Sequence, residues 1–295
     1  MKTALLSACV AFGAFPALAG EPIDVPSTAI RASVTQPHVT AELICEANAF
    51  PNHPLEVVLH LHMDHGWHTY WVNPGDAGLA TTITWELQPW IKAVRPIQWP
   101  VPEREAMGPL TTYGYSDDVY LPTTLDLILP FAGSVGEVIP IKAHVEWLVC
   151  QENCIPGSAD LTLTVPISPL TERIDYVSFL RAVHARLPAA NHTVTVSGHY
   201  ETDRLDLVVT GKGNGPVSDT LSFYPEQPNV LATKSNAIQI DRADPATGSW
   251  RGHLALEQNG EKPGSVSGVL VGFGPTALQI TEFPVTSGPA KPSGK

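Results

Sequence analysis

The chain has 295 residues, a length that predicts two domains of ordinary size. Hydrophobic residues make up 43% and charged residues 16%, a composition that excludes a wholly disordered chain. Acidic residues outnumber basic ones 29 to 17, and no basic stripe is visible, so the charge pattern excludes nucleic acid as a partner. The 28 prolines and 23 glycines indicate many turns and short elements, which favours β-structure over a helical bundle.

Residues 1–19 have the pattern of a cleavable signal peptide. Lys2 supplies a positive charge, residues 4–15 are apolar, and residues 17–19 form an A-x-A cleavage site. A lipoprotein signal ending at Cys9 is the alternative, but only eight residues precede this cysteine, too few for both a charged region and a hydrophobic region. No later stretch reaches the roughly 20 apolar residues of a membrane helix. We therefore expect export, which in a bacterium means the periplasm, and a mature protein that does not span the membrane.

Residues 22–168 are predicted to form an antiparallel β-sandwich. Apolar side chains alternate with others over residues 55–63 and again over residues 139–149, as in half-buried strands. Turn residues separate such runs, for example Asn73–Asp76 and Ser116–Asp118. The aromatic run Trp67–Trp71 is predicted to support the core and its loops, because aromatic side chains dominate core energetics.

Between residues 169 and 188 the apolar residues recur at helical spacing. This predicts a linker helix that Thr171 caps and Pro188 ends, with the apolar stripe Ile174, Val177, Leu180, Val183 and Leu187. Alternation then returns, which predicts a second β-sandwich over residues 190–286, before a disordered tail at 287–295. The predicted fold class is therefore all-β, with two antiparallel β-sandwich domains joined by a short helix.

Three cysteines remain after removal of the signal peptide, and Cys150 and Cys154 are the natural pair. Cys45 is then left without a partner cysteine, and we expect it to be a small, buried, hydrophobic residue within a strand. A strand ends at Cys150 and a short turn precedes Cys154, so a hairpin would bring both to disulfide distance. A closed loop of about five residues contributes only about 2 kcal/mol, which favours a redox role over a structural one.

The surroundings of the pair also predict how it reacts. Glu146 and Glu152 flank it, and anionic neighbours raise thiol pKa values, so we expect a fairly reducing couple. Cys150 ends a strand behind Trp147 and is predicted to be the more shielded cysteine, whereas Cys154 follows the turn and is predicted to be attacked first.

With these motifs the sequence resembles the N-terminal periplasmic domain of the thiol:disulfide interchange protein DsbD, most closely its ScsB-type (suppressor of copper sensitivity) relatives. The resemblance covers residues 40–165 and lies in the segments Gly66–Gly78, Ile83–Trp85, Ile97–Arg104, Tyr113–Tyr115, Trp147–Cys150 and Cys154–Pro156. It implies an immunoglobulin-like sandwich whose catalytic pair, here Cys150 and Cys154, relays reducing equivalents to or from periplasmic proteins.

In that family a membrane-embedded domain and a thioredoxin-like domain follow in the same polypeptide, but this chain ends at Lys295. The expected partners are therefore thioredoxin-like periplasmic proteins and a separate membrane thiol transporter. The expected activity is that of a thiol–disulfide oxidoreductase, as the protein-disulfide reductase component that needs a separate electron donor. A non-catalytic adaptor sandwich with an inert disulfide is the alternative.

A second hypothesis concerns copper. His60, His62 and His65 lie close together with Met63, and imidazole with thioether can hold copper. These four residues are the candidate metal ligands of a periplasmic copper-binding or copper-tolerance protein, a role that the name of the ScsB-type relatives also suggests. The alternative is a solvated strand face followed by a polar turn. No other cofactor is expected.

Overall fold

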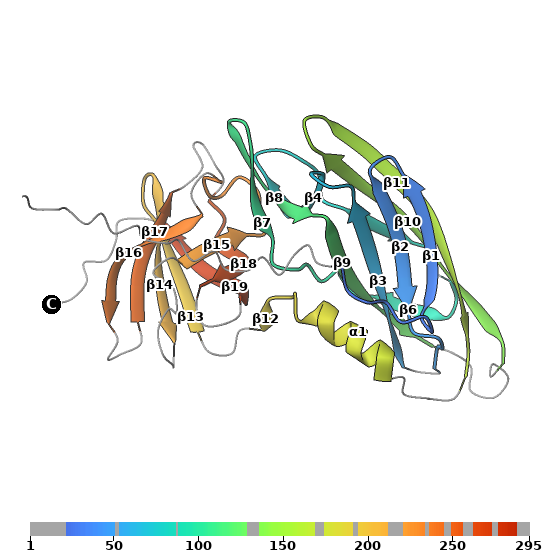
Figure 1. The fold of residues 1–295 in the computed structure, drawn as a ribbon. Helices are drawn as coiled ribbons and strands as arrows, with labels where there is room; N and C mark the ends of the chain where they lie inside the picture. The colour runs from blue at the N-terminus through green and yellow to red at the C-terminus, as the bar shows by residue number, and fades with distance from the viewer. Residues whose placement is uncertain are drawn as a thin grey trace, which may run out of the picture.

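The computed structural model describes residues 22–50, 53–86, 88–128, 136–168, 174–190, 194–211, 221–233, 236–244, 249–255, 262–272 and 277–287. Within these ranges the chain forms β-strands and one α-helix, which packs on the first of two β-domains and leads to the second (Figure 1). No helix in the described ranges is long and apolar enough to cross a membrane. The predicted signal peptide, and the predicted tail apart from Ser287, lie outside the described residues.

The first domain consists of two antiparallel sheets that pack face to face. The first sheet has the strand order β1 (Ile30–Gln36), β2 (Val39–Cys45), β3 (Pro54–Met63), β9 (Asp118–Leu127) and β6 (Ile91–Val94). The second sheet has the order β11 (Cys154–Pro166), β10 (Val138–Cys150), β4 (His68–Gly75), β8 (Leu110–Ser116) and β7 (Glu103–Met107), and β5 (Thr82–Trp85) also pairs with β10.

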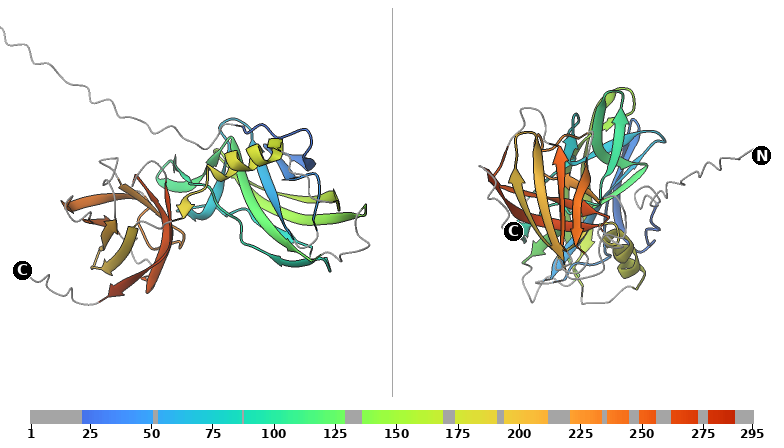
Figure 2. Two further views of the ribbon diagram at one scale, coloured as in Figure 1. Left: turned by 90° about the horizontal axis from the view of Figure 1, so that it is seen from below. Right: turned by 90° about the vertical axis from the view of Figure 1, so that its left-hand side faces the viewer.

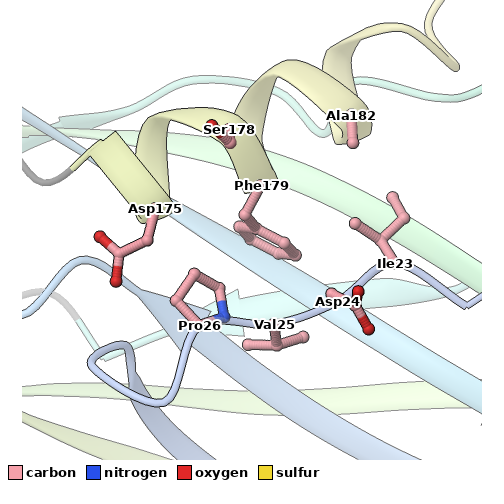
Figure 3. A pocket seen from close by; sticks show the side chains of 8 residues that line it. All are labelled: Ile23, Asp24, Val25, Pro26, Asp175, Ser178, Phe179 and Ala182. Atoms are coloured by element: carbon pink, nitrogen blue, oxygen red, sulfur yellow. The ribbon is translucent and has the colours of Figure 1, made fainter.

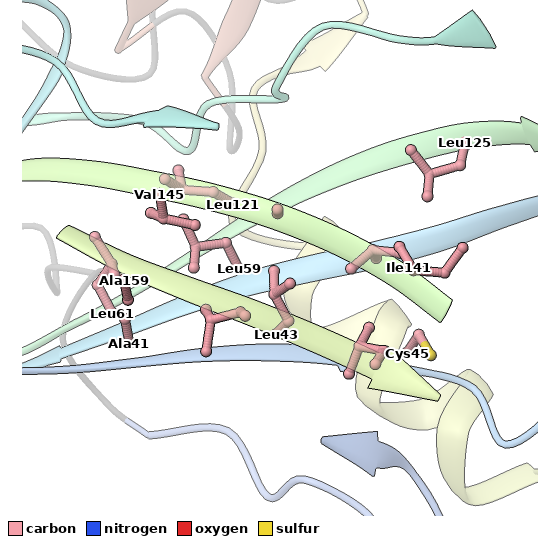
Figure 4. Packing of buried hydrophobic residues seen from close by; sticks show 14 of the residues in the cluster. Ala41, Leu43, Cys45, Leu59, Leu61, Leu121, Leu125, Ile141, Val145 and Ala159 are labelled. Atoms are coloured by element: carbon pink, nitrogen blue, oxygen red, sulfur yellow. The ribbon is translucent and has the colours of Figure 1, made fainter. Parts of the chain in front are cut away.

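The hydrophobic core of the first domain fills the space between these sheets (Figure 4). The alternating residues predicted for β3 are all buried there: Leu55, Val57, Leu59, Leu61 and Met63. Ile141 and Val145 of β10 meet them from the second sheet (Figure 4). Cys45 lies in the same core at the end of β2, fully buried, so its prediction as a small buried hydrophobic residue is confirmed.

Helix α1 (Ile174–His184) covers the outer face of the first sheet, which is turned away from that core (Figure 1). The buried residues beneath it are Ile44, Val58, Tyr120, Tyr176, Phe179 and Val183. The described helix is shorter than the predicted 169–188, and the predicted cap Thr171 lies outside the described residues. Val177, predicted for the apolar stripe, is 46% exposed, because the helix turns Tyr176 and Phe179 to the sheet instead.

The chain segment before β1 runs beside α1 (Figure 3). Phe179 points from the helix toward this segment, where Ile23 and Val25 pack against the cluster under the helix. The amide of Ile23 donates a hydrogen bond to the hydroxyl of Tyr120 at 2.9 Å, and the hydroxyl of Thr28 donates one to Asp175 at 2.7 Å. These contacts tie the N-terminal segment to both the helix and the first sheet.

The second domain is built from the strands that follow the helix. They are β12 (Ala189–Ala190), β13 (Val194–Tyr200), β14 (Arg204–Gly211), β15 (Leu221–Pro225), β16 (Ala237–Asp244), β17 (Ser249–Ala255), β18 (Ser265–Val271) and β19 (Leu278–Ser287). β16 pairs with both β15 and β17, and β19 pairs with both β18 and β13, so the strands β13 to β19 form one continuous sheet that closes on itself. The predicted fold class is confirmed, whereas the boundaries 22–168, 169–188 and 190–286 stay a prediction.

The two domains meet at the second sheet. Trp71 and Tyr113 of the first domain form an aromatic cluster with Tyr224 of β15, with ring centroids 5.2 to 6.4 Å apart. Val269 of β18 also packs against the core of the first domain. In Figure 1, β4, β7 and β8 face β15 and β18, and Figure 2 shows the same neighbourhood from two other sides.

Candidate functional site

The predicted cysteine pair forms a disulfide at the mouth of the β10–β11 hairpin. Cys150 and Cys154 occupy opposite positions in the strand register, with Cα atoms 4.2 Å apart. The alternation of β10 explains which way the pair faces. Val145, Trp147 and Val149 are buried in the core, so the next position, Cys150, lies on the opposite face of the sheet.

The two sulfurs differ sharply in their access to solvent. Cys150 is fully buried because β10 is an inner strand, and Cys150 stands in register between Cys154 on one side and His68 of β4 on the other. Cys154 begins the edge strand β11 and is exposed. The predicted difference in shielding between the two cysteines is confirmed.

The aromatic side chain at the disulfide is Tyr70, not Trp147. His68 and Tyr70 are two residues apart in β4, so they share the face that carries the disulfide. The hydroxyl of Tyr70 lies 3.5 Å from Cys154 Sγ, and it donates the hydrogen bond because a disulfide sulfur has no proton. Trp147 instead turns inward against Gly157, where a Cβ would stand 2.5 Å from the indole ring.

Burial sets the protonation of both β4 side chains. It lowers the pKa of His68, so the imidazole is neutral at pH 7, and its Nε2 has no hydrogen-bond partner among the described residues. Burial raises the pKa of Tyr70, so the phenol keeps its proton and remains a donor toward Cys154. Glu146 and Glu152, predicted to make the couple reducing, are both exposed. The reducing character stays a prediction.

A short segment crosses the disulfide face above Tyr70. The sequence predicts a turn at Asn73–Asp76, but β4 continues with an irregular register through Gly75, and the turn begins at Asp76. Two residues later Gly78, at φ +115°, packs on the ring of Tyr70 so closely that a Cβ would stand 2.3 Å from it. The phenol next to Cys154 is therefore covered by this segment.

The histidines form a separate arrangement on the first sheet. His60 Nε2 lies 2.6 Å and His62 Nδ1 lies 3.0 Å from the same oxygen of Asp118, and His60 Nδ1 is 3.7 Å from Glu42. His65 is fully exposed, and Met63 points into the core, away from the face of His60 and His62. The structure brings His60 and His62 together but not the predicted set of four. Among the described residues there is no group of three or more His, Cys, Asp or Glu placed to hold a metal ion.

Comparisons with known proteins agree with this fold. Residues 40–166 match the family model described as thiol:disulfide interchange protein DsbD, N-terminal. The crystal structure of the N-terminal periplasmic domain of ScsB from Proteus mirabilis superposes with a TM-score of 0.63 at 17% sequence identity, over 87% of this chain and 97% of that one. The YadV chaperone aligns at 9% identity over 80% of this chain and 96% of that one, with a TM-score of 0.22, too low to carry an argument about the fold. No curated protein matches the chain.

Proposed function

Because residues 40–166 belong to the family of the N-terminal domain of the thiol:disulfide interchange protein DsbD, we propose that Cys150 and Cys154 are the redox pair of a periplasmic exchange module. One observation carries the proposal: the disulfide joins a fully buried sulfur to an exposed one on an edge strand. Such a pair offers a partner one sulfur to attack and keeps the other for resolving the mixed disulfide.

The exchange proceeds in two balanced steps. In the reduced module, the Cys154 thiolate attacks a disulfide of the partner, a bond forms between Cys154 and the partner, and the second partner sulfur leaves as a thiolate. The Cys150 thiolate then attacks Cys154 Sγ, which reforms the intramolecular disulfide and releases the remaining partner sulfur as a thiolate. Once both released thiolates are protonated, two electrons and two protons have passed to the partner.

Two side chains of β4 support these steps. Tyr70 donates its hydroxyl proton toward Cys154 Sγ, a contact that stabilises a thiolate at this sulfur more than a thiol. His68 stands beside Cys150 in the strand register and is neutral at pH 7, so it can accept the proton that the Cys150 thiol loses on becoming a nucleophile. Tyr70 is therefore placed to stabilise a thiolate at Cys154, and His68 is placed to act as the proton acceptor for Cys150.

The partners that suit this chemistry are thioredoxin-like periplasmic proteins, with a membrane thiol transporter as the source of electrons. The predicted signal peptide supports a periplasmic location, and the superposed ScsB structure is that of a periplasmic domain. The expected in vivo role is that of a protein-disulfide reductase component, because the flanking glutamates favour a reducing couple.

Electron transfer to a partner tests the proposal. The reduced full chain is mixed with an oxidised thioredoxin-like protein, the reaction is quenched with acid, and the thiols of both proteins are counted by mass after alkylation. We expect the partner to gain two thiols while the chain loses two, and the Cys150→Ala/Cys154→Ala variant to transfer none. A wild-type chain that transfers no faster than this variant would support the inert adaptor instead.

A further inference from the structure

We propose that the face of the second sheet around Cys154 is a docking surface for thioredoxin-like proteins that carry lysine and arginine side chains around their active-site cysteines. The docking face is defined as Cys154 and the residues around it: Tyr70, Leu79, Glu103, Glu146 and Glu152. The proposal rests on the proposed function, and it adds which thioredoxin-like proteins the module selects.

Two glutamates flank the disulfide on the β10–β11 hairpin. Because side chains alternate along a strand, Glu146 shares the face of Cys150, four residues or about 13 Å away. Glu146 stands in register between Ser158 of β11 and Thr82 of β5, so neither direct neighbour supplies a cation. Glu152 is the middle residue of the turn between the cysteines, and both glutamates are exposed. Their charges are therefore presented to a protein that approaches the disulfide.

Further carboxylates lie toward the other edge of this sheet, on β7. Gly114 of β8 stands in register between Tyr70 of β4 and Glu103 of β7, and positions directly opposite share a face, so Glu103 lies on the face of Tyr70. Glu105 follows two residues later on the same face. Burial raises the pKa of Glu103, and the charges of Glu105 and Asp117 raise it further, so several carboxylates gather at this side. Four strand spacings of about 4.8 Å separate β11 from β7, which fits the roughly 800 Å² that one partner buries in an ordinary interface.

The cations that the structure describes in the first domain do not balance this charge. Three of them lie on or beside strands of the first sheet: Arg31, Lys92 and Arg95. Arg104 stands in register with Tyr113, whose side chain is buried in the core, so Arg104 is on the opposite side of the sheet from the docking face. Lys142 shares the face of Cys150 but lies eight residues or about 27 Å from it, and it is paired with Glu86 at 3.2 Å. The part of the face around the disulfide is therefore acidic.

An exposed apolar side chain lies inside this acidic rim. Leu79 follows Gly78, which packs on the ring of Tyr70, and the hydroxyl of Tyr70 contacts Cys154. Leu79 is 67% exposed, more than any other large hydrophobic residue that the structure describes. Protein interfaces typically have an apolar centre with a polar rim, and a few central side chains supply most of the binding energy. Leu79 is placed to be such a side chain, with the glutamates as the rim.

The charge of the docking face selects the partner. An acidic surface attracts a basic one and repels an acidic one, which changes mainly the rate at which two proteins associate. A thioredoxin-like protein must bring its own cysteines against Cys154, so lysines and arginines around those cysteines would lie over the glutamates. The same surface should slow exchange with partners whose active face is acidic.

Small disulfides of opposite charge test the docking face without a protein partner. The reduced full chain is mixed with cystamine, which is cationic, or with dithiodipropionate, which is anionic, at low and at high salt. In each reaction the Cys154 thiolate attacks one sulfur of the reagent and one reagent thiolate leaves. The Cys150 thiolate then attacks Cys154 and releases the other, so the chain loses two electrons and the reagent becomes two thiols. We expect salt to slow the reaction with cystamine and to speed the reaction with dithiodipropionate.

Charge-neutral variants assign this effect to the two glutamates. Replacing glutamates also changes the thiol pKa values, so the readout is the ratio of the cystamine rate constant to the dithiodipropionate rate constant, in which that change cancels. Two unit charges about 10 Å apart in water change a rate about twofold, and salt screening reduces this, so the ratio at low salt should be about fivefold lower in Glu146→Gln/Glu152→Gln than in the wild type. Asp203→Asn/Glu282→Gln removes two exposed carboxylates of the second domain, and its ratio should stay within twofold of the wild type.

A protein partner tests the docking itself. The probe is an oxidised thioredoxin-like protein with two lysines beside its active-site cysteines, compared with its variant in which both lysines are glutamates. Exchange with the variant should be about tenfold slower at low salt. Leu79→Ala should slow exchange with the lysine-bearing protein about fivefold, while its rates with the two small disulfides stay within twofold of the wild type.

Three results would overturn the proposal. They are a cystamine-to-dithiodipropionate ratio that does not change with salt, a ratio that Glu146→Gln/Glu152→Gln leaves unchanged, and equal exchange rates for the lysine-bearing and glutamate-bearing proteins. Failure of the proposed function looks different. In that case neither protein exchanges with the chain, while the charge-dependent ratio for the small disulfides is still observed.

Discussion

Loss of the disulfide should weaken the first domain only slightly. The perturbation is the replacement of both cysteines by alanine, or reduction of the wild-type chain. The bond joins residues four apart in sequence, and closing so short a loop contributes about 2 kcal/mol in the chain-entropy model. The rest of the hairpin does not depend on it, because β10 and β11 pair continuously from Val138 and Pro166 up to the cysteines.

Tryptophan fluorescence during urea unfolding is the assay. Six of the seven tryptophans lie in the first domain and report on it: Trp67, Trp71, Trp85, Trp90, Trp99 and Trp147. A loss of about 2 kcal/mol moves the urea midpoint by about 1 M without changing the slope. An alanine variant that is unfolded in water would refute the reasoning and make the bond a structural staple.

Three further predictions address other sites. Burial alone would lower the pKa of His60, but the hydrogen bond to Asp118 and the contact with Glu42 outweigh burial and raise the pKa. The stability that protonated His60 contributes is therefore complete below about pH 6.5, and it is lost as the pH rises through the raised pKa. The difference in unfolding free energy between the wild type and His60→Gln should therefore shrink from pH 6 to pH 9, and a constant difference would contradict this. Burial raises the pKa of Cys45, so its thiol should react with a chromogenic disulfide only after unfolding, and prompt reaction in the native chain would count against the buried assignment. If copper binds at the histidines, titration with Cu(I) or Cu(II) should show a site that the His60→Gln/His62→Gln variant lacks, and equal binding by both chains would exclude them as ligands.

The alternation of apolar side chains with others along the sequence predicted most strands of the first domain. It placed Leu59 and Leu61 in the core, and the same alternation left Cys150 on the other face of β10. The short spacing of the cysteines predicted the hairpin disulfide, and the exposed position of Cys154 followed from the turn before it. Local sequence is enough for such features because strands and hairpins are set by near neighbours.

The residues around the disulfide could not be predicted in this way. Tyr70 and Cys154 are 84 positions apart, and only the pairing of β4 with β10 brings them together. The contact of Asn73 with Pro225 spans 152 positions and depends on how one domain docks on the other. The alternation of β3 could have indicated that Met63 faces away from His60 and His62, because odd and even positions of a strand point to opposite faces.

The central claim is that Cys154 is the sulfur through which exchange with partners takes place. The direct test uses a thioredoxin-like protein whose resolving cysteine is replaced and whose attacking cysteine carries thionitrobenzoate, so that each attack releases a coloured thiolate and leaves a stable adduct. Reduced Cys150→Ser, which retains Cys154, should form the mixed disulfide rapidly, and reduced Cys154→Ser should form far less over the same time, because Cys150 is fully buried. Equal yields from the two variants, or more adduct on Cys150, would contradict the account.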